Sequence, residues 1–450
     1  MTNITVHIKY NFEYFDEIKQ YLQNNDIEYE LLNPNAKSFK FKGNKTQYNN
    51  FLKFIADNKY DIKTITNLNS LEPRCVGLKL LSNLLPIATN GTFTPRQLAT
   101  VYNLNGNINL NNSRIAIISL GGGYRQSDMN TYWSFVGLTQ NPILTDISID
   151  GATNTPGLDS GSVETVLDIQ VAGGLNYNSN IDIYFAPNNF TSFYNAIFSA
   201  VYNSNKYDTI SISWGLAESE WGADNINLFN ELFEDAANVL NITICVASGD
   251  RGSSDGLSGL NVDYPAGSPW ILSCGGTTLI CPDLNYSSSS TSETVWNNSS
   301  GATGGGFSAF LSISSWQLPI VITNYPLQVK RSVPDISAVA DPNTGYIIYL
   351  FGKYYTVGGT SAVAPLLAGY IASFKKGFII QKLYNSYLFS KTITHDILIG
   401  NNSNVNTMQT CADCYISNDS IKWKALPSYD ACTGMGTPNG TVLTPIIQSY

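Results

Sequence analysis

The chain has 450 residues, of which 43% are apolar and only 13% are charged, and its formal net charge at pH 7 is −9. This length allows two or three domains with a sizeable core, and the acidic balance argues against nucleic-acid and anionic-membrane partners. Few carboxylates suit a protein that stays soluble in acid, although compositional drift in an Asn- and Ile-rich source gives the same pattern.

No run of about 18 apolar residues is present, so no membrane-spanning helix is expected. The first residues, Met1–His7, lack a charged segment followed by an apolar block, which is the pattern of a signal peptide. The sequence alone therefore leaves the localisation of the protein unknown.

The first 70 residues alternate between strand and helix patterns. Strands are predicted at 4–10, 27–32, 38–42 and 61–66, and helices at 12–24 and 46–57. The order β-α-β-β-α-β in a short segment predicts a small ferredoxin-like α+β domain at 1–70. Residues 71–92, which contain Pro73, Pro86 and Gly91, are predicted to be a linker to a second domain at 93–450.

From residue 93 onward, short apolar runs alternate with helical patterns. The runs are nearly apolar throughout, as buried parallel strands are, and the two sets predict a doubly wound α/β sheet flanked by helices. The predicted strands are 114–120, 181–186, 209–213 and 242–247, and the predicted helices are 162–173, 190–203 and 225–239. In such sheets the active site lies beyond the carboxyl ends of the strands.

A glycine-rich stretch, Gly358–Pro365, joins a predicted strand at 349–357 to an apolar helix at 366–374. Glycines let the backbone turn and let a substrate approach, and a helix N-terminus offers N–H groups to a developing oxyanion. Ser361 in this stretch is therefore a candidate nucleophile. A turn with a capping serine explains the same residues equally well.

A serine nucleophile needs a base, and the chain has only two histidines, His7 and His395. Neither lies in a segment that resembles a subtilisin histidine motif. Glu164 and Asp168 are four residues apart on a predicted helix and so share one face. When both are ionised they repel, so one tends to hold a proton and can serve as base and then acid. The alternative is a solvated helix face with two acids.

Several motifs in order resemble those of the sedolisins, the serine-carboxyl peptidases, over roughly residues 93 to 440. The resemblance suggests a subtilisin-like sheet and a peptidase with an N-terminal prodomain. It rests on the following segments: Thr94–Leu98, Ile115–Tyr124, Glu164-x-x-x-Asp168, Ile181–Pro187, Ser248–Asp250, Tyr264–Ala266, Gly275–Thr277, Gly304–Ser308, Val333–Ile336 and Gly359–Ser361.

The resemblance implies a role for each site residue. Ser361 attacks the peptide carbonyl, Glu164 takes and returns the proton, and Asp168 holds Glu164 in place. Asp250 faces the oxyanion and can help only when protonated, because a carboxylate repels an oxyanion. An acid-active enzyme made as a zymogen and working outside the cell or in an acidic compartment is therefore expected. The prodomain-like segment is shorter than is typical of the family.

The resemblance also implies one calcium ion, Ca2+, near the C-terminus. Asp396, Ile397 and Asp430 match family ligands, whereas Leu426 and Ser428 stand where the family has glycines. The main-chain carbonyls at 426 and 428 can still bind calcium only if the backbone keeps its conformation. An acid-capped loop is the alternative.

Seven cysteines are present, and Cys411, Cys414 and Cys432 form a C-terminal group. A zinc site there would want a fourth ligand, so a local disulfide or free thiols are expected, and Cys245 is assigned to the core. The sequence predicts a monomeric peptidase acting on peptides or proteins. A catalytically silent relative used for binding is the rival, and the choice between endopeptidase and tripeptidyl peptidase stays open.

Overall fold

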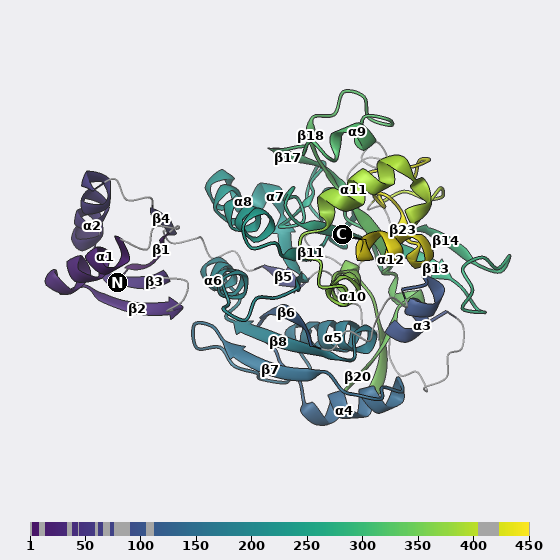
Figure 1. The fold of residues 1–450 in the computed structure, drawn as a ribbon, viewed down its shortest axis with the longest axis horizontal. Helices are drawn as coiled ribbons and strands as arrows, with labels where there is room; N and C mark the ends of the chain where they lie inside the picture. Colours follow the sequence, from purple (N-terminus) through teal and green to yellow (C-terminus); the bar gives the residue numbers. More distant parts are fainter. Residues whose placement is uncertain are drawn as a thin grey trace.

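The computed structural model describes residues 2–8, 14–33, 38–43, 45–58, 62–65, 73–75, 91–104, 112–403 and 423–449. Cys411, Cys414 and most of the predicted linker lie outside these residues. Figure 1 shows a small N-terminal lobe beside a larger body that is built around one sheet.

The N-terminal lobe contains one antiparallel sheet of strand order β2-β3-β1-β4 and two helices. Ile18 and Leu22 of the first helix and Phe51 of the second are fully buried. This is the β-α-β-β-α-β order that the sequence predicts, and the ferredoxin-like domain at 1–70 stays a prediction. The elements are β1 (Thr2–Ile8), α1 (Tyr14–Asn24), β2 (Glu28–Asn33), β3 (Ser38–Gly43), α2 (Lys45–Asp57) and β4 (Ile62–Ile65).

The larger body contains an eight-stranded sheet of order β14-β13-β11-β9-β6-β8-β7, with β19 also paired to β13. Every pair is parallel except β13 with β14. The predicted doubly wound parallel sheet is therefore confirmed. Its strands are β6 (Ser113–Leu120), β7 (Ile143–Ser148), β8 (Ser179–Ala186), β9 (Thr209–Ile212), β11 (Thr243–Ala247), β13 (Leu272–Ile280), β14 (Ser292–Val295) and β19 (Ile336–Val339).

Alternate residues of each buried strand face two different cores, because successive side chains point to opposite faces of a sheet. In β6, Ile115 and Ile117 pack in one core with helices α5 (Ser160–Leu175) and α10 (Thr360–Ala372). Ala116 and Ile118 pack in the other with α6 (Phe190–Val201) and α8 (Ala223–Asn238). Both faces are covered, which is why these strands are apolar throughout.

No helix among the described residues is long and apolar enough to cross a membrane. Shorter elements surround the sheet. They are α3 (Pro95–Val101), α4 (Gln126–Phe135), β10 (Trp214–Ala217), α7 (Glu218–Trp221), β12 (Asp263–Tyr264), β15 (Asn297–Asn298), β16 (Gly301–Ala302), β17 (Gly306–Ser312), α9 (Leu318–Val321), β18 (Lys330–Val333), α11 (Ile380–Phe389), β22 (Thr394–His395), β23 (Thr437–Pro438), α12 (Gly440–Gln448) and the 3-10 turns Gly252–Ser254, Pro342–Thr344 and Lys391–Ile393.

The prediction of a single strand at 349–357 is wrong. This segment belongs to an antiparallel hairpin of β20 (Tyr346–Leu350) and β21 (Lys353–Val357), which is separate from the parallel sheet. The chain reverses at Phe351 and Gly352, whose φ angles are 48° and 79°. Ser361 therefore follows a strand of this hairpin and not the carboxyl end of a strand of the parallel sheet.

Part of the predicted linker at residues 71–92 forms secondary structure. Arg74 and Cys75 form a short strand, β5, which pairs antiparallel with β10. The predicted linker is thus attached to the larger body at this edge.

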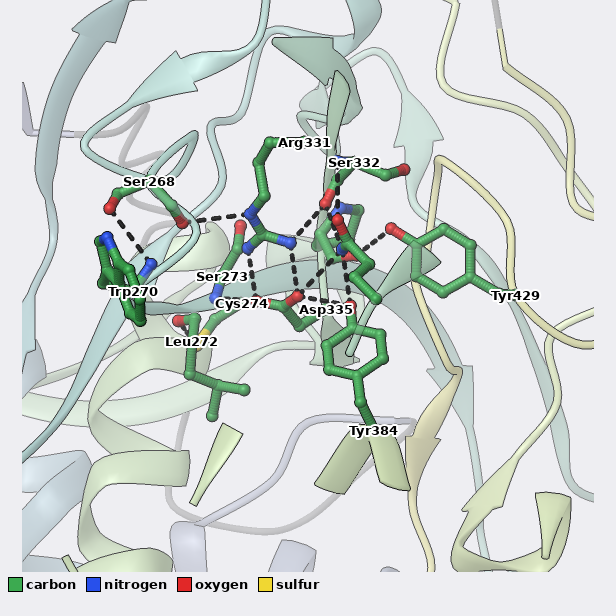
Figure 2. A network of polar contacts seen from close by, with 12 residues as sticks. Ser268, Trp270, Leu272, Ser273, Cys274, Arg331, Ser332, Asp335, Tyr384 and Tyr429 are labelled. Carbon is green, nitrogen blue, oxygen red and sulfur yellow. Dashed lines mark hydrogen bonds and ion pairs between the residues drawn. The ribbon is translucent and has the colours of Figure 1, made fainter. Parts of the chain in front are cut away.

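A buried ion pair fastens the segment before β19, as Figure 2 shows. Arg331 donates to both oxygens of Asp335 at 2.6 Å, and Tyr384 and the main-chain N–H of Ser273 donate to the same carboxylate at 2.5 and 2.7 Å. Arg331 and Asp335 are 2% and 0% exposed. Removing either partner would leave a buried charge unpaired, which typically costs about 3–5 kcal/mol.

Candidate active site

Helix α5 carries Glu164 and Asp168, and both side chains are fully buried. The helix begins where the Asp159 side chain accepts a hydrogen bond from the Ser162 N–H at 2.8 Å. After its first residue every position of the helix is buried, as expected of a helix that crosses a core. The alternative of a solvated acidic face is therefore wrong.

Ser361 lies in the first turn of α10, and it is also fully buried. The turn before it needs glycine: Gly359 has a φ of 126°, and a Cβ on Gly358 would lie 2.3 Å from the Ala340 carbonyl oxygen. Helices α5 and α10 pack closely where Gly369 faces Ala172. A Cβ on Gly369 would lie 2.9 Å from the Ala172 carbonyl oxygen, so this contact needs glycine. This packing sets the separation of Ser361 from the two acids.

Ser213 connects the two helices, a role that no motif in the sequence indicates. Its hydroxyl lies 2.8 Å from Asp168 Oδ1, to which it donates, and 3.2 Å from the main-chain carbonyl oxygen of Ser361. Ser213 follows directly after β9, so the central sheet positions both Asp168 and the nucleophile turn. A serine after a strand is too common a feature to be recognised from sequence.

Glu164 lies in an environment that favours its protonated form. Burial, followed by the charge of Asp168, holds its pKa well above the ordinary value, and the hydroxyl of Ser361 acts in the opposite direction as a hydrogen-bond donor. Neither Glu164 oxygen makes a hydrogen bond of ordinary length and angle. Burial also raises the pKa of Asp168 well above its ordinary value. The pair can therefore hold and exchange a proton.

Asp250 follows the carboxyl end of β11 and contacts the residue before Ser361. Its Oδ1 accepts hydrogen bonds from the main-chain N–H and the hydroxyl of Thr360, at 2.7 and 2.8 Å. Its Oδ2 is buried and has no hydrogen-bond partner. Burial raises the pKa of Asp250 to about 7. In acid this side chain is a neutral carboxylic acid with one oxygen available to carry a proton.

A second group of predicted residues meets in the C-terminal region. The Ser428 N–H donates to Asp396 at 2.8 Å, and the Leu426 N–H donates to Asp430 at 3.2 Å. Ser428 has a φ of 69°, which is a conformation that favours glycine. The backbone at 428 has thus kept a glycine-like conformation. Ile397 follows Asp396 directly and is buried.

His395 and Cys432 border the C-terminal group, because His395 directly precedes Asp396 and the Cys432 main-chain N–H donates to Asp430 at 2.8 Å. His7 is in β1, and His395 in β22 stacks on Tyr286 with ring centroids 3.6 Å apart. Cys245 is fully buried in β11, as predicted. Cys245, Cys274, Cys281 and Cys432 are free thiols, and among the described residues no group of three or more His, Cys, Asp or Glu side chains could hold a metal.

Comparisons with known proteins identify families and solved structures to which the chain is similar. The sequence model of the subtilase family matches residues 149–404, which is more than half of the chain. Kumamolisin from Bacillus sp. (strain MN-32) is 38% identical over 366 residues, which are 77% of this chain and 62% of the relative. Sedolisin from Pseudomonas sp. (strain 101) is 30% identical over 355 residues, which are 73% of this chain and 59% of the relative.

Among solved structures, Pseudomonas sedolisin, a serine-carboxyl proteinase complexed with two molecules of pseudo-iodotyrostatin, superposes with a TM-score of 0.67 at 26% identity. The match covers 81% of this chain and all of that one. The chain spans less than two thirds of the length of the two curated relatives. The family match, the related sequences and the shared fold show that the chain belongs to the subtilase family and, within it, to the sedolisins.

Proposed function

We propose that this chain is an acid-active serine-carboxyl peptidase that hydrolyses peptide bonds with Ser361 as nucleophile. The observation that carries the proposal is the burial of Glu164 and Asp168 on the helix packed against α10, with Ser213 contacting both Asp168 and Ser361. Burying two ionised acids destabilises the folded state, so such acids are usually protonated or retained because they serve a function. A proton-transfer pair is the use that fits their position.

In the proposed reaction the Ser361 oxygen attacks the peptide carbonyl carbon while Glu164 accepts the hydroxyl proton. The same proton then passes from Glu164 to the leaving amine, and an acyl-enzyme is left. In the second half a water oxygen attacks the acyl carbon while Glu164 accepts a proton from the water. The bond from the acyl carbon to the Ser361 oxygen then breaks, Glu164 returns the proton to that oxygen, and the carboxylic acid product leaves. Asp168, held by Ser213, orients Glu164 and shares its proton.

Asp250 is the proposed oxyanion donor. The contacts with Thr360 occupy Oδ1, so a proton on Oδ2 is free to be donated to the developing negative charge. The raised pKa of about 7 supplies that proton throughout the acid range. The same carboxyl also accepts the first N–H of α10, so it holds the nucleophile turn in place.

The C-terminal loop fits one calcium ion. Calcium prefers carboxylate and main-chain carbonyl oxygens, and Asp396 and Asp430 meet here beside residues 426 and 428. The positive φ of Ser428 keeps the backbone conformation that the family's glycine would give. We assign Asp396, Asp430 and the main-chain carbonyls of Ile397, Leu426 and Ser428 as ligands. The ion would stabilise this loop, and no reaction step involves it.

The proposed enzyme is made as a zymogen in which residues 1–70 form a prodomain and residues 71–92 a linker. The supporting observation is the pairing of β5 with β10, directly beyond Ser213. A strand at this edge lies next to the site and would obstruct a substrate there.

A comparison of the parent protein with Ser361→Ala tests the proposed function against a catalytically silent relative. The parent should cleave a peptide library at acid pH, and Ser361→Ala should not. Ser373→Ala, at the far end of the same helix, serves as a matched control and should keep the activity. A parent that cleaves nothing, or a Ser361→Ala protein that cleaves as well as the parent, would refute the assignment.

A further inference from the structure

Strand β10 offers a main-chain edge beside the proposed active site. It begins immediately after Ser213, and its partner on this edge is β5, with Cys75 opposite Trp214 and Arg74 opposite Gly215. Strand β5 also lies against α5, which carries the two acids. Arg74 and Cys75 thus form an extended segment paired antiparallel with β10, and such pairing is a common mode of peptide recognition.

The direction of this strand identifies which part of a substrate it resembles. Because β5 is antiparallel to β10, the chain approaches Ser213 as its residue numbers rise, and Cys75 lies nearer to the site than Arg74. A substrate in the same place would present the residues upstream of the bond to be cut. The position of Arg74 is then separated from that bond by at least one residue.

The surroundings of Arg74 are acidic. Its guanidinium forms an ion pair with Glu220 in α7, with Nη2 and Oε2 3.0 Å apart. The Glu220 side chain is 24% exposed and Arg74 is 40% exposed, so the pair lies in a part of the surface that a substrate side chain could also enter.

Two buried acids, Asp255 and Asp263, also lie near Arg74. Asp263 Oδ1 has no hydrogen-bond partner. A Cβ built on Gly215 would lie only 2.1 Å from this oxygen, so Asp263 faces Gly215, the residue that pairs with Arg74. Burial raises the pKa of both acids, and the charge of Arg74 acts in the opposite direction on each. Both acids are therefore neutral in acid, and Glu220 is the acid that forms the ion pair with Arg74.

We propose that β10 binds the upstream part of a peptide substrate and that Glu220 selects Arg or Lys at the position that Arg74 occupies in this structure. The inference rests on the proposed peptidase function and adds to it the class of substrate: peptides with a basic residue upstream of the scissile bond, though not immediately next to it. In the uncut chain Arg74 itself fills this position.

The test is a positional peptide library digested at pH 5.5, where free carboxyl side chains carry charge. The full chain is first kept at acid pH until its activity is constant. The parent should prefer Arg or Lys over Gln at the second or third residue upstream by about two- to fivefold, the range of a partly exposed ion pair. Glu220→Gln should remove this preference, and Glu220→Lys should reverse it in favour of Glu or Asp.

Asp224→Asn provides the control, because Asp224 is an exposed acid near α7 that has no part in the proposed site. It should leave the preference intact. A parent that cleaves peptides without an upstream basic preference, or a Glu220→Gln protein with the parent's preference, overturns this inference and leaves the peptidase standing. A parent that cleaves no peptide overturns both proposals. Melting curves of each variant confirm that a lost preference is not lost folding.

Discussion

Thr360 donates both its main-chain N–H and its hydroxyl to one oxygen of Asp250, at 2.7 and 2.8 Å, and leaves the other oxygen buried without a partner. One carboxyl group thus does two things that are often done by separate groups. It accepts the first N–H of the helix that carries Ser361, and in its protonated form it can donate to an oxyanion. The two roles use different oxygens, so they do not compete.

Asp250→Asn is expected to separate charge from hydrogen bonding at this position. Asparagine can accept from Thr360 and donate from its amide, but it does not titrate, so activity should no longer fall as the pH rises through about 7. The overall rate should drop, though by less than for Asp250→Ala, for which about 10²- to 10³-fold in kcat is expected. The measurement is kcat against pH for all three proteins, and an unchanged profile for Asp250→Asn would remove Asp250 from the reaction.

The buried acids make a prediction about stability. Burial raises the pKa values of four acids above those of the unfolded chain: Glu164, Asp168, Asp250 and Asp255. Between the unfolded and the folded pKa values of these groups, the folded protein binds more protons than the unfolded chain. Their contribution to the free energy of unfolding should therefore be complete below about pH 4 and should be lost as the pH rises through about 7.

This dependence can be measured as the melting temperature between pH 4 and pH 8. Asp250→Asn should show a smaller decline than the parent, because one of the titrating groups has been removed. Asp224→Asn, at an exposed position, should follow the parent. A melting temperature that rises steadily from pH 4 to pH 8 would contradict the account of the buried carboxyl groups.

The calcium assignment predicts that added calcium raises the melting temperature. A ligand present at 100 times its Kd contributes about 2.7 kcal/mol to the free energy of unfolding. Asp430→Asn should abolish this response. Ser428→Gly should preserve it and stabilise the loop, because the φ of 69° at this residue suits glycine. Indifference of the parent's melting curve to both calcium and chelator would count against the site.

The zymogen proposal predicts that acid releases an N-terminal fragment. Exposed linkers are the usual sites of proteolysis, so the new N-terminus should fall between residues 68 and 93. Ser361→Ala should stay intact when incubated alone. N-terminal sequencing after acid incubation decides the matter, and a fully active parent that is never cut would show that the first domain is permanent.

The parts of the fold that depend on local pattern were predictable from the sequence. The strand ending at Leu120 and the helix around Glu164 were recognised because a buried strand and a buried helix each have a distinct length and composition. The spacing of Glu164 and Asp168 placed both on one helix face. The turn before Ser361 was predicted from its glycines, which it requires for steric reasons, and Ser361 stays a candidate nucleophile.

The features that depend on distant partners were not predictable. The hairpin reversal at Phe351 was missed because an apolar segment on both sides of Gly352 looks like one strand. The link from Ser213 to Asp168 joins residues 45 positions apart, and the ion pair of Arg74 with Glu220 spans 146. Contacts of this kind are set by the packing of the sheet and leave no local pattern.

The dependence of peptide hydrolysis on pH tests the central claim most directly, with Ser361→Ala as the blank. A histidine base works when neutral, so a histidine-dependent enzyme gains activity as the pH rises past about 6 to 7. Here the base belongs to the coupled pair of Glu164 and Asp168, and the oxyanion donor is protonated Asp250. The account predicts a bell-shaped curve with its maximum on the acid side of pH 7. A parent enzyme with its maximum at pH 8 would contradict the account.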